Sequence, residues 1–464
     1  MNGLSQLNQV LAVLKQNHNK ILARLMEFAA IPSVSTDPAH APDMRAAADW
    51  VAAELTASGP ITVRMIETAG NPIVYGEWLG APGKPTVLVY GHYDVQPPDP
   101  LEKWHSPPFT PTVRDGRLYA RGVSDDKGPM LIPIKVARGF LKTTNALPIN
   151  VKFMFEGEEE IGSPHLESFI AEHKELLAAD FVLSADGAMW RINEPSLTVA
   201  SRGLAGLELT LTAASKDLHS GRHGGGVANP LHSMSRLIAS LHDDNGRVTV
   251  AGFYDRVVEL TSDERTAIKA LPFDEAAYLN QVGAPETFGE SGYSTLERQW
   301  ARPTLEVNGM WGGYEGPGQK TVIPSEAHAK ITCRLVPDQN PEEISELVKR
   351  HLESHVPQGT TLTVRLNDHG ARPSHIRADH SALKTANSAL TTVYGVSPLI
   401  VRMGGTVPIS ELFQRLMQLD TVFFSFSTAD EDYHSPNEFF RIHRLHEGLE
   451  SWARYWYLLG ETTA

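Results

Sequence analysis

Residues 85–94 read Pro-Thr-Val-Leu-Val-Tyr-Gly-His-Tyr-Asp, a short apolar run that leads directly into His92 and Asp94. Apolar runs of this length, rich in β-branched and aromatic residues and bounded by Gly or polar residues, are typical of buried strands. Three further runs lead into acidic or histidine residues: 151–155 into Glu158, Glu159 and Glu160, 181–184 into Asp186, and 421–426 into Asp430, Asp432 and His434. In open α/β sheets, ligands collect beyond the carboxyl ends of the strands. The pattern therefore predicts an α/β fold with a polar site at one sheet edge.

Each of these elements, taken alone, has an ordinary structural explanation. Consecutive glutamates favour the start of a helix, and Asp186 by itself fits a helix N-cap. A fifth element, residues 121–128 (Arg-Gly-Val-Ser-Asp-Asp-Lys-Gly), places Asp125 and Asp126 at the start of a predicted helix that runs to about Leu141. Because carboxylates and histidines recur at equivalent places, a hydrolytic site with two metal ions is the best explanation of the whole set.

Several segments resemble the motifs of the dinuclear-zinc metallopeptidases, a family that includes aminoacylases, carnosinases, cytosolic nonspecific dipeptidases and glutamate carboxypeptidases. In the order typical of the family, they are 91–95 (GHYDV), 121–129 (RGVSDDKGP), 158–163 (EEEIGS), 216–221 (KDLHSG), 320–324 (KTVIP), 334–337 (RLVP), 404–408 (GGTVP) and 434–438 (HSPNE). The resemblance is closest to the dipeptidase and carnosinase branch, and it covers the chain from about residue 80 to 440.

The pattern along the chain predicts two domains. Residues 1–198 and 382–464 alternate helix-like and strand-like stretches, which predicts a catalytic α/β domain in two segments, with a mixed, mostly parallel sheet flanked by helices. Residues 199–381 combine alternating apolar and polar positions, as in 207–211, with helical patterns, which predicts an inserted α+β domain. The resemblance implies that this insert is a lid and also the dimerisation domain.

Within these domains the periodicity predicts individual elements. The predicted helices are 229–242, 262–270, 342–353, 382–394 and 445–459. The predicted strands are 248–252, 327–335 and 360–366, and the Gly-rich stretch 309–318 is predicted to be a loop. Leucines at helical spacing in residues 4–14 predict an amphipathic helix and not a signal peptide.

Composition favours a soluble enzyme of the cytoplasm. A chain of 464 residues is long enough for two domains, and 41% hydrophobic and 21% charged residues are ordinary values for a globular protein. The formal net charge of -14 disfavours a nucleic-acid surface, and no apolar run approaches the length of a membrane span. The single cysteine, Cys333, excludes an intramolecular disulfide and favours an intracellular, cytoplasmic location.

The resemblance implies two divalent metal ions with Asp125 as their shared ligand. One ion would be completed by His92 and Asp186, and the other by Glu160 and His434. Nitrogen and carboxylate ligands suit Zn²⁺, although Mn²⁺ or Co²⁺ would accept the same set. A shared carboxylate allows two dications to lie about 3.5–4 Å apart in a hydrolase.

The resemblance also implies the roles of the residues around the ions. Glu159 would be the general base, which takes a proton from a metal-bridging water and passes it to the leaving amine. The Glu-Glu-Glu sequence also permits a shifted register with Glu158 as the base, but the following residues 161–163 (Ile-Gly-Ser) favour Glu159. Asp94 is expected to accept the second imidazole N–H of His92 and to orient that ring. A cis peptide bond is expected between Asp125 and Asp126.

Substrate contacts are expected mainly from the inserted domain. By resemblance, His219 stabilises the oxyanion of the scissile carbonyl and comes from the partner subunit, with Thr321 beside it; alternatively, it is a structural histidine in a turn. Arg334 would bind the substrate carboxylate. His369 and Thr406 match positions of further carboxylate contacts, where the family often has serine in place of Thr406.

These predictions combine into a cytosolic, homodimeric, dinuclear metallohydrolase that cleaves dipeptides with a free C-terminal carboxylate. Two related activities remain open, those of a metal-dependent N-acyl-amino-acid amidohydrolase and of a short-peptide carboxypeptidase. A third alternative is an inactive homologue that holds metal or binds another protein. The expected partners are a small peptide substrate and a second copy of the chain, without nucleic acid or membrane.

Overall fold

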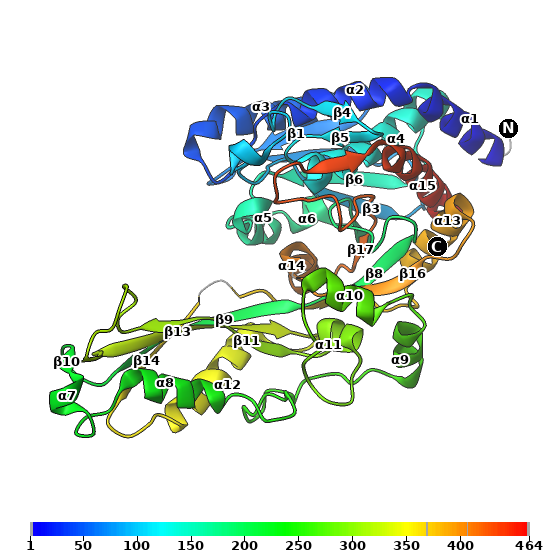
Figure 1. Ribbon diagram of the computed structural model, residues 1–464. Coiled ribbons are helices and arrows are strands. Elements are labelled where there is room, and N and C mark those ends of the chain that lie inside the picture. Colours follow the sequence, from blue (N-terminus) through cyan, green and yellow to red (C-terminus); the bar gives the residue numbers. More distant parts are fainter. Residues whose placement is uncertain (1–2, 368–369, 406, 462–464) are drawn as a thin grey trace. The chain divides into compact units, whose positions relative to one another are not determined.

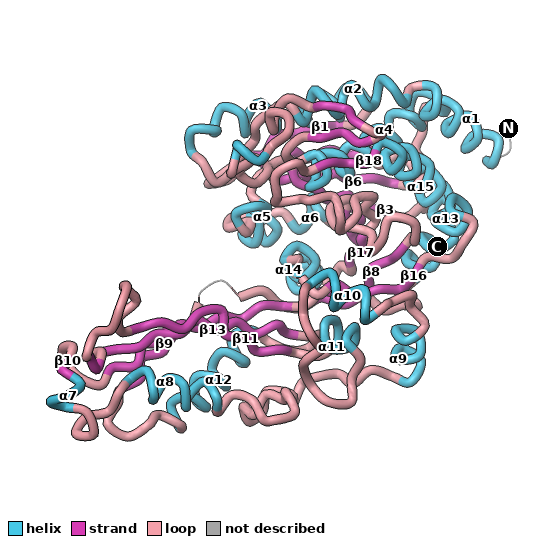
Figure 2. Tube along the Cα trace, viewed as in Figure 1, coloured by secondary structure: helices cyan, strands magenta, loops and turns pink. Residues whose placement is uncertain are grey.

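The computed structural model describes residues 3–367, 370–405 and 407–461, and the chain divides into two compact units (Figure 1). Unit 1 comprises residues 1–199, 376–401 and 412–464, and unit 2 comprises residues 200–375 and 402–411. Each unit has its own hydrophobic core. Helices and strands alternate through unit 1, whereas unit 2 is built around one long antiparallel sheet (Figure 2).

Unit 1 contains a six-stranded sheet in the order β1-β2-β6-β3-β7-β17. Its strands are β1 (Thr62–Ile66), β2 (Ile73–Trp78), β6 (Asn150–Glu156), β3 (Thr86–His92), β7 (Phe181–Ser184) and β17 (Thr421–Phe423). The four strands from β6 to β17 are parallel to one another, and β1 and β2 pair antiparallel. This arrangement confirms the predicted mixed, mostly parallel α/β sheet. It also brings the carboxyl ends of the four parallel strands to one edge.

Helices flank this sheet. They are α1 (Gly3–Gln16), α2 (His18–Ala29), α3 (Ala41–Ser58), α4 (Gly128–Thr144), α5 (Leu166–Glu172), α6 (Lys174–Leu177), α13 (Ser381–Tyr394) and α15 (Ile442–Glu461). Helix α3 packs on β1 and β2, and α4 packs on β3 and contacts α1, α3 and α15. Helices α5 and α6 lie on the opposite side of the sheet (Figure 1). Phe153 and Trp452 are among the fully buried side chains of the core between helices and sheet.

A small three-stranded sheet connects segments that are far apart in the sequence. Its strands are β4 (Thr112–Arg114), β5 (Arg117–Tyr119) and β18 (Phe439–Arg441), in the order β18-β5-β4. Because β18 pairs with β5, the loop before β18 lies beside the segment that follows β5. Another small sheet contains β15 (Ser374–His375), β8 (Ser196–Ser201) and β16 (Leu399–Met403), where the chain passes between the units, and α14 (Pro408–Met417) follows it.

Unit 2 is centred on a four-stranded antiparallel sheet in the order β11-β13-β9-β14. The strands are β11 (Thr304–Gly312), β13 (Glu326–Leu335), β9 (Gly203–Thr212) and β14 (Thr361–Leu366). Helices α8 (Pro230–Ala239) and α12 (Pro341–Ser354) pack on it. Alternate residues of β9 and β13 are buried under these helices, as the pattern in 207–211 predicts.

The remaining elements of unit 2 are short. They are β10 (Leu218–His219), β12 (Val322–Ile323), α7 (Ser220–His223), α9 (Ser262–Lys269), α10 (Glu275–Val282) and α11 (Thr295–Ala301). The predicted strand 248–252 is wrong, because Val248 forms only an isolated bridge with His242. The loop predicted for 309–318 is wrong at its start, since β11 continues to Gly312 after a register shift between Val307 and Gly309. Pairing with β13 there outweighs the low strand propensity of glycine.

No helix among residues 3–367, 370–405 and 407–461 is both long and apolar enough to cross a bilayer.

Candidate metal centre

The predicted metal ligands of unit 1 come from the carboxyl ends of neighbouring parallel strands and from two loops. His92 is the last residue of β3, and Glu160 lies in a short 3₁₀ turn (Glu159–Ile161) after β6. Asp186 follows β7 by two residues, and His434 lies in the loop between β17 and β18. Parallel pairing in register, with His92 opposite Glu156, brings these strand ends together. The edge predicted from the sequence is therefore where these side chains gather.

Asp125 lies between the two histidines. Its Oδ1 is 3.1 Å from His92 Nε2, and its Oδ2 is 3.0 Å from His434 Nε2. His434 Nε2 is also 3.2 Å from Glu160 Oε2. Two groups of possible ligand atoms result, one from His92, Asp125 and Asp186 and the other from Asp125, Glu160 and His434, each with its atoms within 4.8 Å of one another. The carboxylate of Asp125 belongs to both groups.

The electrostatics of this cluster fit divalent cations. Hydrogen bonds that His434 donates to Asp125 and Glu160 raise its pKa to about 10, and burial raises the pKa of Asp186 to about 6. Carboxylates that are this crowded and buried attract positive charge, whether as protons on the imidazoles or as metal ions. Imidazole nitrogen and carboxylate oxygen are the usual ligands of Zn²⁺ in hydrolases. The donor set therefore fits two metal ions that share Asp125.

The segment that contains Asp125 is held in place by hydrogen bonds to a buried glutamate, Glu438. Its carboxylate accepts hydrogen bonds from the backbone N–H groups of Gly122 at 2.7 Å, Ser124 at 2.9 Å and Asp125 at 3.2 Å. It also pairs with Arg121 at 2.7 Å, and both side chains are 1% exposed. The peptide bond between Asp125 and Asp126 is cis, which confirms the expectation. The role of Glu438 is not predicted from the sequence, although the motif 434–438 contains this residue.

Asp94 holds the turn that carries the glutamates. Its carboxylate accepts the N–H of Glu160 at 3.0 Å and of Glu159 at 3.3 Å, and the hydroxyl of Ser35 at 2.7 Å. The nearer partner of His92 Nδ1 is the backbone carbonyl of Asp94, at 3.1 Å, while the carboxylate lies at 3.4 Å. The expected contact of the Asp94 carboxylate with His92 is thus secondary. Its closer contacts are to two backbone amides and a hydroxyl, because the turn after β6 folds over Asp94.

The three consecutive glutamates point to different partners. Glu158 Oε2 is 2.8 Å from His165 Nδ1, and its Oε1 accepts the N–H of Asn71 at 3.2 Å. Glu160 accepts a hydrogen bond from Gln96 Nε2 at 2.8 Å, a contact that the sequence analysis missed. Burial raises the pKa of Glu159 well above its ordinary value, and the charges of Asp186 and Asp125 add to the effect. The side chain of Glu158 is therefore turned to structural partners, while Glu159 is close enough to Asp186 and Asp125 for their charges to act on its carboxylate.

The predicted substrate residues belong to unit 2. His219 ends β10, accepts the N–H of Gly221 at 3.1 Å through Nδ1, and has Nε2 3.5 Å from Thr321 Oγ1. Arg334 is on β13, near Arg202; burial, followed by the charge of Arg334, lowers the pKa of Arg202 to about 10. Unit 2 therefore places Thr321 beside His219, as expected. His369 and Thr406 lie outside the described residues.

Sequence comparisons identify the family. Residues 88–457 match the model of peptidase family M20/M25/M40. The Beta-Ala-His dipeptidase of Homo sapiens is 33% identical over 389 residues, which are 83% of this chain and 76% of that protein. The Cys-Gly metallodipeptidase dug1 of Schizosaccharomyces pombe is 32% identical over 464 residues, which are 97% of each chain.

Solved structures agree with these matches. The structure of human carnosine dipeptidase 1 is 30% identical with a TM-score of 0.80, and the similarity covers 98% of this chain and 99% of that one. An M20 family metallo-carboxypeptidase, Sso-CP2 from Sulfolobus solfataricus, is 32% identical with a TM-score of 0.83. This similarity covers 95% of this chain and 99% of that one. The predicted fold class and the predicted peptidase are confirmed. The chain therefore belongs to peptidase family M20/M25/M40, as a metallopeptidase of its dipeptidase and carnosinase branch.

Proposed function

We propose that this chain is a dinuclear metal-dependent dipeptidase that cleaves the peptide bond of dipeptides with a free C-terminal carboxylate. The observation that carries the proposal is the position of Asp125, whose two oxygens lie at hydrogen-bond distance from His92 and His434. Such a carboxylate suits a bridge between two metal ions. The similarity to a β-Ala-His dipeptidase and a Cys-Gly metallodipeptidase supports the substrate class.

In this proposal, His92 and Asp186 hold one ion, Glu160 and His434 hold the other, and Asp125 holds both. Zn²⁺ is the preferred metal for these ligands, and Mn²⁺ or Co²⁺ would also be accepted. When bound, two such ions polarise a carbonyl group and lower the pKa of water towards neutrality.

The side chains of the chain itself carry the proton and hold the geometry. Glu159 takes the proton of the attacking water and delivers it to the amine that leaves. Asp94 fixes the turn of Glu159 and Glu160 through two backbone hydrogen bonds. Glu158 is occupied by His165 and Asn71, which supports Glu159 over Glu158 as the base.

Substrate binding is assigned to unit 2. His219 donates a hydrogen bond to the carbonyl oxygen as negative charge develops there, with Thr321 beside it. Arg334 binds the C-terminal carboxylate, because a guanidinium can form two parallel hydrogen bonds with it. His369 and Thr406 are proposed as further contacts to this carboxylate.

The proposal includes a homodimer formed by the inserted domain, with each site completed by His219 of the other subunit. Strand β11 is the last strand of its sheet and exposes Val307, Met310 and Trp311, which are 39%, 48% and 41% exposed. Edge strands with exposed apolar side chains are natural pairing surfaces, which supports a second copy as the partner. A cytoplasmic location is proposed from the single buried cysteine, Cys333.

The test is a substrate panel assayed with zinc, manganese and cobalt in turn. We expect hydrolysis of dipeptides, including β-Ala-His and Cys-Gly, and much slower hydrolysis of the same dipeptides with an amidated C-terminus. Faster hydrolysis of the matching N-acetyl amino acids would overturn the dipeptidase assignment in favour of an amidohydrolase. Arg334→Ala should raise KM for the free dipeptide and leave the amidated one unaffected.

A short-peptide carboxypeptidase is a second candidate, favoured by the similarity to the metallo-carboxypeptidase Sso-CP2. Such an enzyme would also release the C-terminal residue of tripeptides and of N-blocked dipeptides. A dipeptidase would prefer free dipeptides by a large factor in kcat/KM. The ratio of these two rates, measured with one preparation and one metal, distinguishes the candidates.

A further inference from the structure

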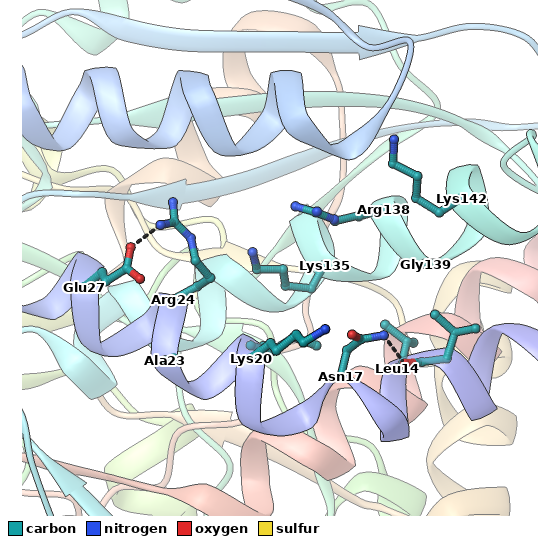
Figure 3. Close-up of a pocket in the computed structure, with 12 residues that line it drawn as sticks. Leu14, Asn17, Lys20, Ala23, Arg24, Glu27, Lys135, Arg138, Gly139 and Lys142 are labelled. Carbon is teal, nitrogen blue, oxygen red and sulfur yellow. Dashed lines mark hydrogen bonds and ion pairs between the residues drawn. The ribbon is translucent and has the colours of Figure 1, made fainter.

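Basic side chains surround a pocket of about 560 Å³ on unit 1 that none of the predicted metal or catalytic residues lines. The pocket lies between α1, α2 and α4 (Figure 3). Lys20 and Arg24 line it from α2, and Lys135, Arg138 and Lys142 line it from α4 (Figure 3). The whole chain carries a net charge of -14, so this concentration of positive charge runs against the average of the molecule.

Helical spacing explains how the basic residues come together. Lys135, Arg138 and Lys142 are three and four residues apart and therefore share one face of α4. Lys20 and Arg24 are four residues apart and share one face of α2. Like charges at this spacing destabilise a helix, so helix stability does not account for the arrangement.

Two carboxylates offset part of the charge. Glu54 on α3 is 2% exposed, accepts a hydrogen bond from Arg24 Nε at 2.8 Å and another from Lys135, and lies 3.5 Å from Arg138 Nη1. Burial alone would raise the pKa of Glu54, but Lys135 and Arg24 lower it, so this carboxylate is charged. Glu27 pairs with Arg24. Five basic side chains thus face two carboxylates, an excess of three positive charges.

The charge that is not offset lies at the rim. Lys20 and Lys142 are exposed, and no acidic side chain among residues 3–367, 370–405 and 407–461 forms an ion pair with either. Arg138 is 46% exposed, and in the part of the chain that the structure describes its one ion pair is the 3.5 Å contact with Glu54. These three side chains can therefore turn to an anion without breaking a strong existing ion pair.

The inner wall of the pocket is apolar, with Val13, Leu14, Ile21 and Gly139 among its residues. We propose that this pocket binds a phosphorylated small molecule with an aromatic or apolar body, of the size of a nucleoside diphosphate. Lys20, Arg138 and Lys142 contact the phosphates, and the body packs on the apolar wall. The volume is within the roughly 300–1,000 Å³ of typical ligand pockets. An extended polyanion such as RNA is disfavoured, because the rest of this acidic chain would repel it.

The experiment titrates the metal-loaded enzyme with ADP, and separately with inorganic pyrophosphate, by calorimetry at low salt. The test variant is Lys20→Ala/Lys142→Ala, and the matched control is Lys174→Ala/Lys269→Ala, which removes two other exposed lysines. We expect ADP to bind, the test variant to bind it roughly tenfold more weakly or worse, and the control to bind as the unaltered chain does. Pyrophosphate should bind more weakly than ADP. Unchanged melting temperatures would exclude misfolding as the cause.

Each other outcome overturns the proposal. ADP binding that the test variant leaves unchanged would place the ligand elsewhere, for example at the metal ions. Equal affinity for pyrophosphate and ADP would mean that the apolar part of the ligand does not contribute to binding. No binding of ADP up to about 1 mM would mean that the basic face is only solvated. Lysine-dependent binding to vesicles containing phosphatidylglycerol, without binding of ADP, would identify a membrane surface instead.

Discussion

At the scale of single residues, the direction of one side chain decides which glutamate can act as a base. Glu158, Glu159 and Glu160 are adjacent, yet Glu158 contacts His165 and Asn71 while Glu160 contacts His434 and Gln96. Because the three glutamates lie in a tight turn, their side chains point in different directions although the residues are adjacent. Glu159 has neither set of partners, and burial, together with the charges of Asp186 and Asp125, raises its pKa well above the ordinary value.

Glu159→Gln should retain both metal ions and lower kcat by about 10²–10⁴-fold, because only the proton acceptor is removed. Glu158→Gln is the matched control and should keep most of the activity, since an amide can still reach His165 and Asn71. Metal content from mass spectrometry and kcat from steady-state assays provide the check. A fully active Glu159→Gln variant with both metals bound would transfer the role to another group.

At the scale of elements, the centre depends on loops that hold each other in place. β18 pairs with β5, and this pairing carries Glu438 to the backbone N–H groups of Gly122, Ser124 and Asp125. Gly122 has a φ of 77° there, and a Cβ on it would lie 2.0 Å from Val95 Cγ1. The sharp turn before Asp125 therefore requires glycine, and Glu438 supplies its hydrogen-bond acceptors.

Glu438→Gln should weaken metal binding by about 10–100-fold, because the amide offers one acceptor oxygen where the carboxylate offers two. At saturating metal, kcat should stay near that of the unaltered enzyme, since Glu438 does not touch the substrate. Glu447→Gln is a suitable control, as it loses a carboxylate contact with Arg444 on α15 without affecting these loops. Metal affinity is measured by competition with a chelating dye. Equal affinities in the two variants would refute the supporting role of Glu438.

At the scale of the whole molecule, the metal ions are expected to stabilise unit 1. The buried carboxylates of the centre repel one another without a compensating cation. Removal of the metal with EDTA should lower the melting temperature by about 5 °C or more, and zinc should restore it. The variant Asp125→Asn weakens both groups of ligands. Its melting temperature should therefore differ much less between the EDTA-treated and the zinc-loaded protein. A melting temperature that chelation leaves unaltered, with loss of metal verified, would argue against a stabilising centre.

The dimer can be tested by complementation. His219→Ala and Glu159→Gln homodimers should each be nearly inactive, whereas a mixture should recover about a quarter of the normal activity. Half of statistically reassorted dimers are heterodimers, and each would contain one intact site if His219 serves the partner subunit. Native mass spectrometry verifies the reassortment. Heterodimers without activity would mean that His219 acts in its own chain or has no catalytic role.

The sequence alone predicted the class of fold and the edge of the sheet at which the candidate ligands gather. Strand runs that end in His92, Glu160 and Asp186 are local patterns, and parallel pairing necessarily brings their carboxyl ends to one edge. The alternation in 207–211 likewise predicted a strand with one buried face. In contrast, 248–252 and the end of β11 were wrongly predicted, because their state depends on pairing with a distant segment.

Only the tertiary structure decided which partners these residues have. The Asp94 carboxylate accepts hydrogen bonds from the Ser35 hydroxyl and the backbone N–H of Glu160, and Glu438 accepts one from the backbone N–H of Gly122. These hydrogen bonds join segments that are tens to hundreds of residues apart. The basic pocket also depends on the tertiary structure, since α2 and α4 are separate in sequence. In the sequence, their lysines look like ordinary solvated residues. Helix and strand periodicity is a short-range property, whereas hydrogen-bond partners and charge clusters arise from long-range packing.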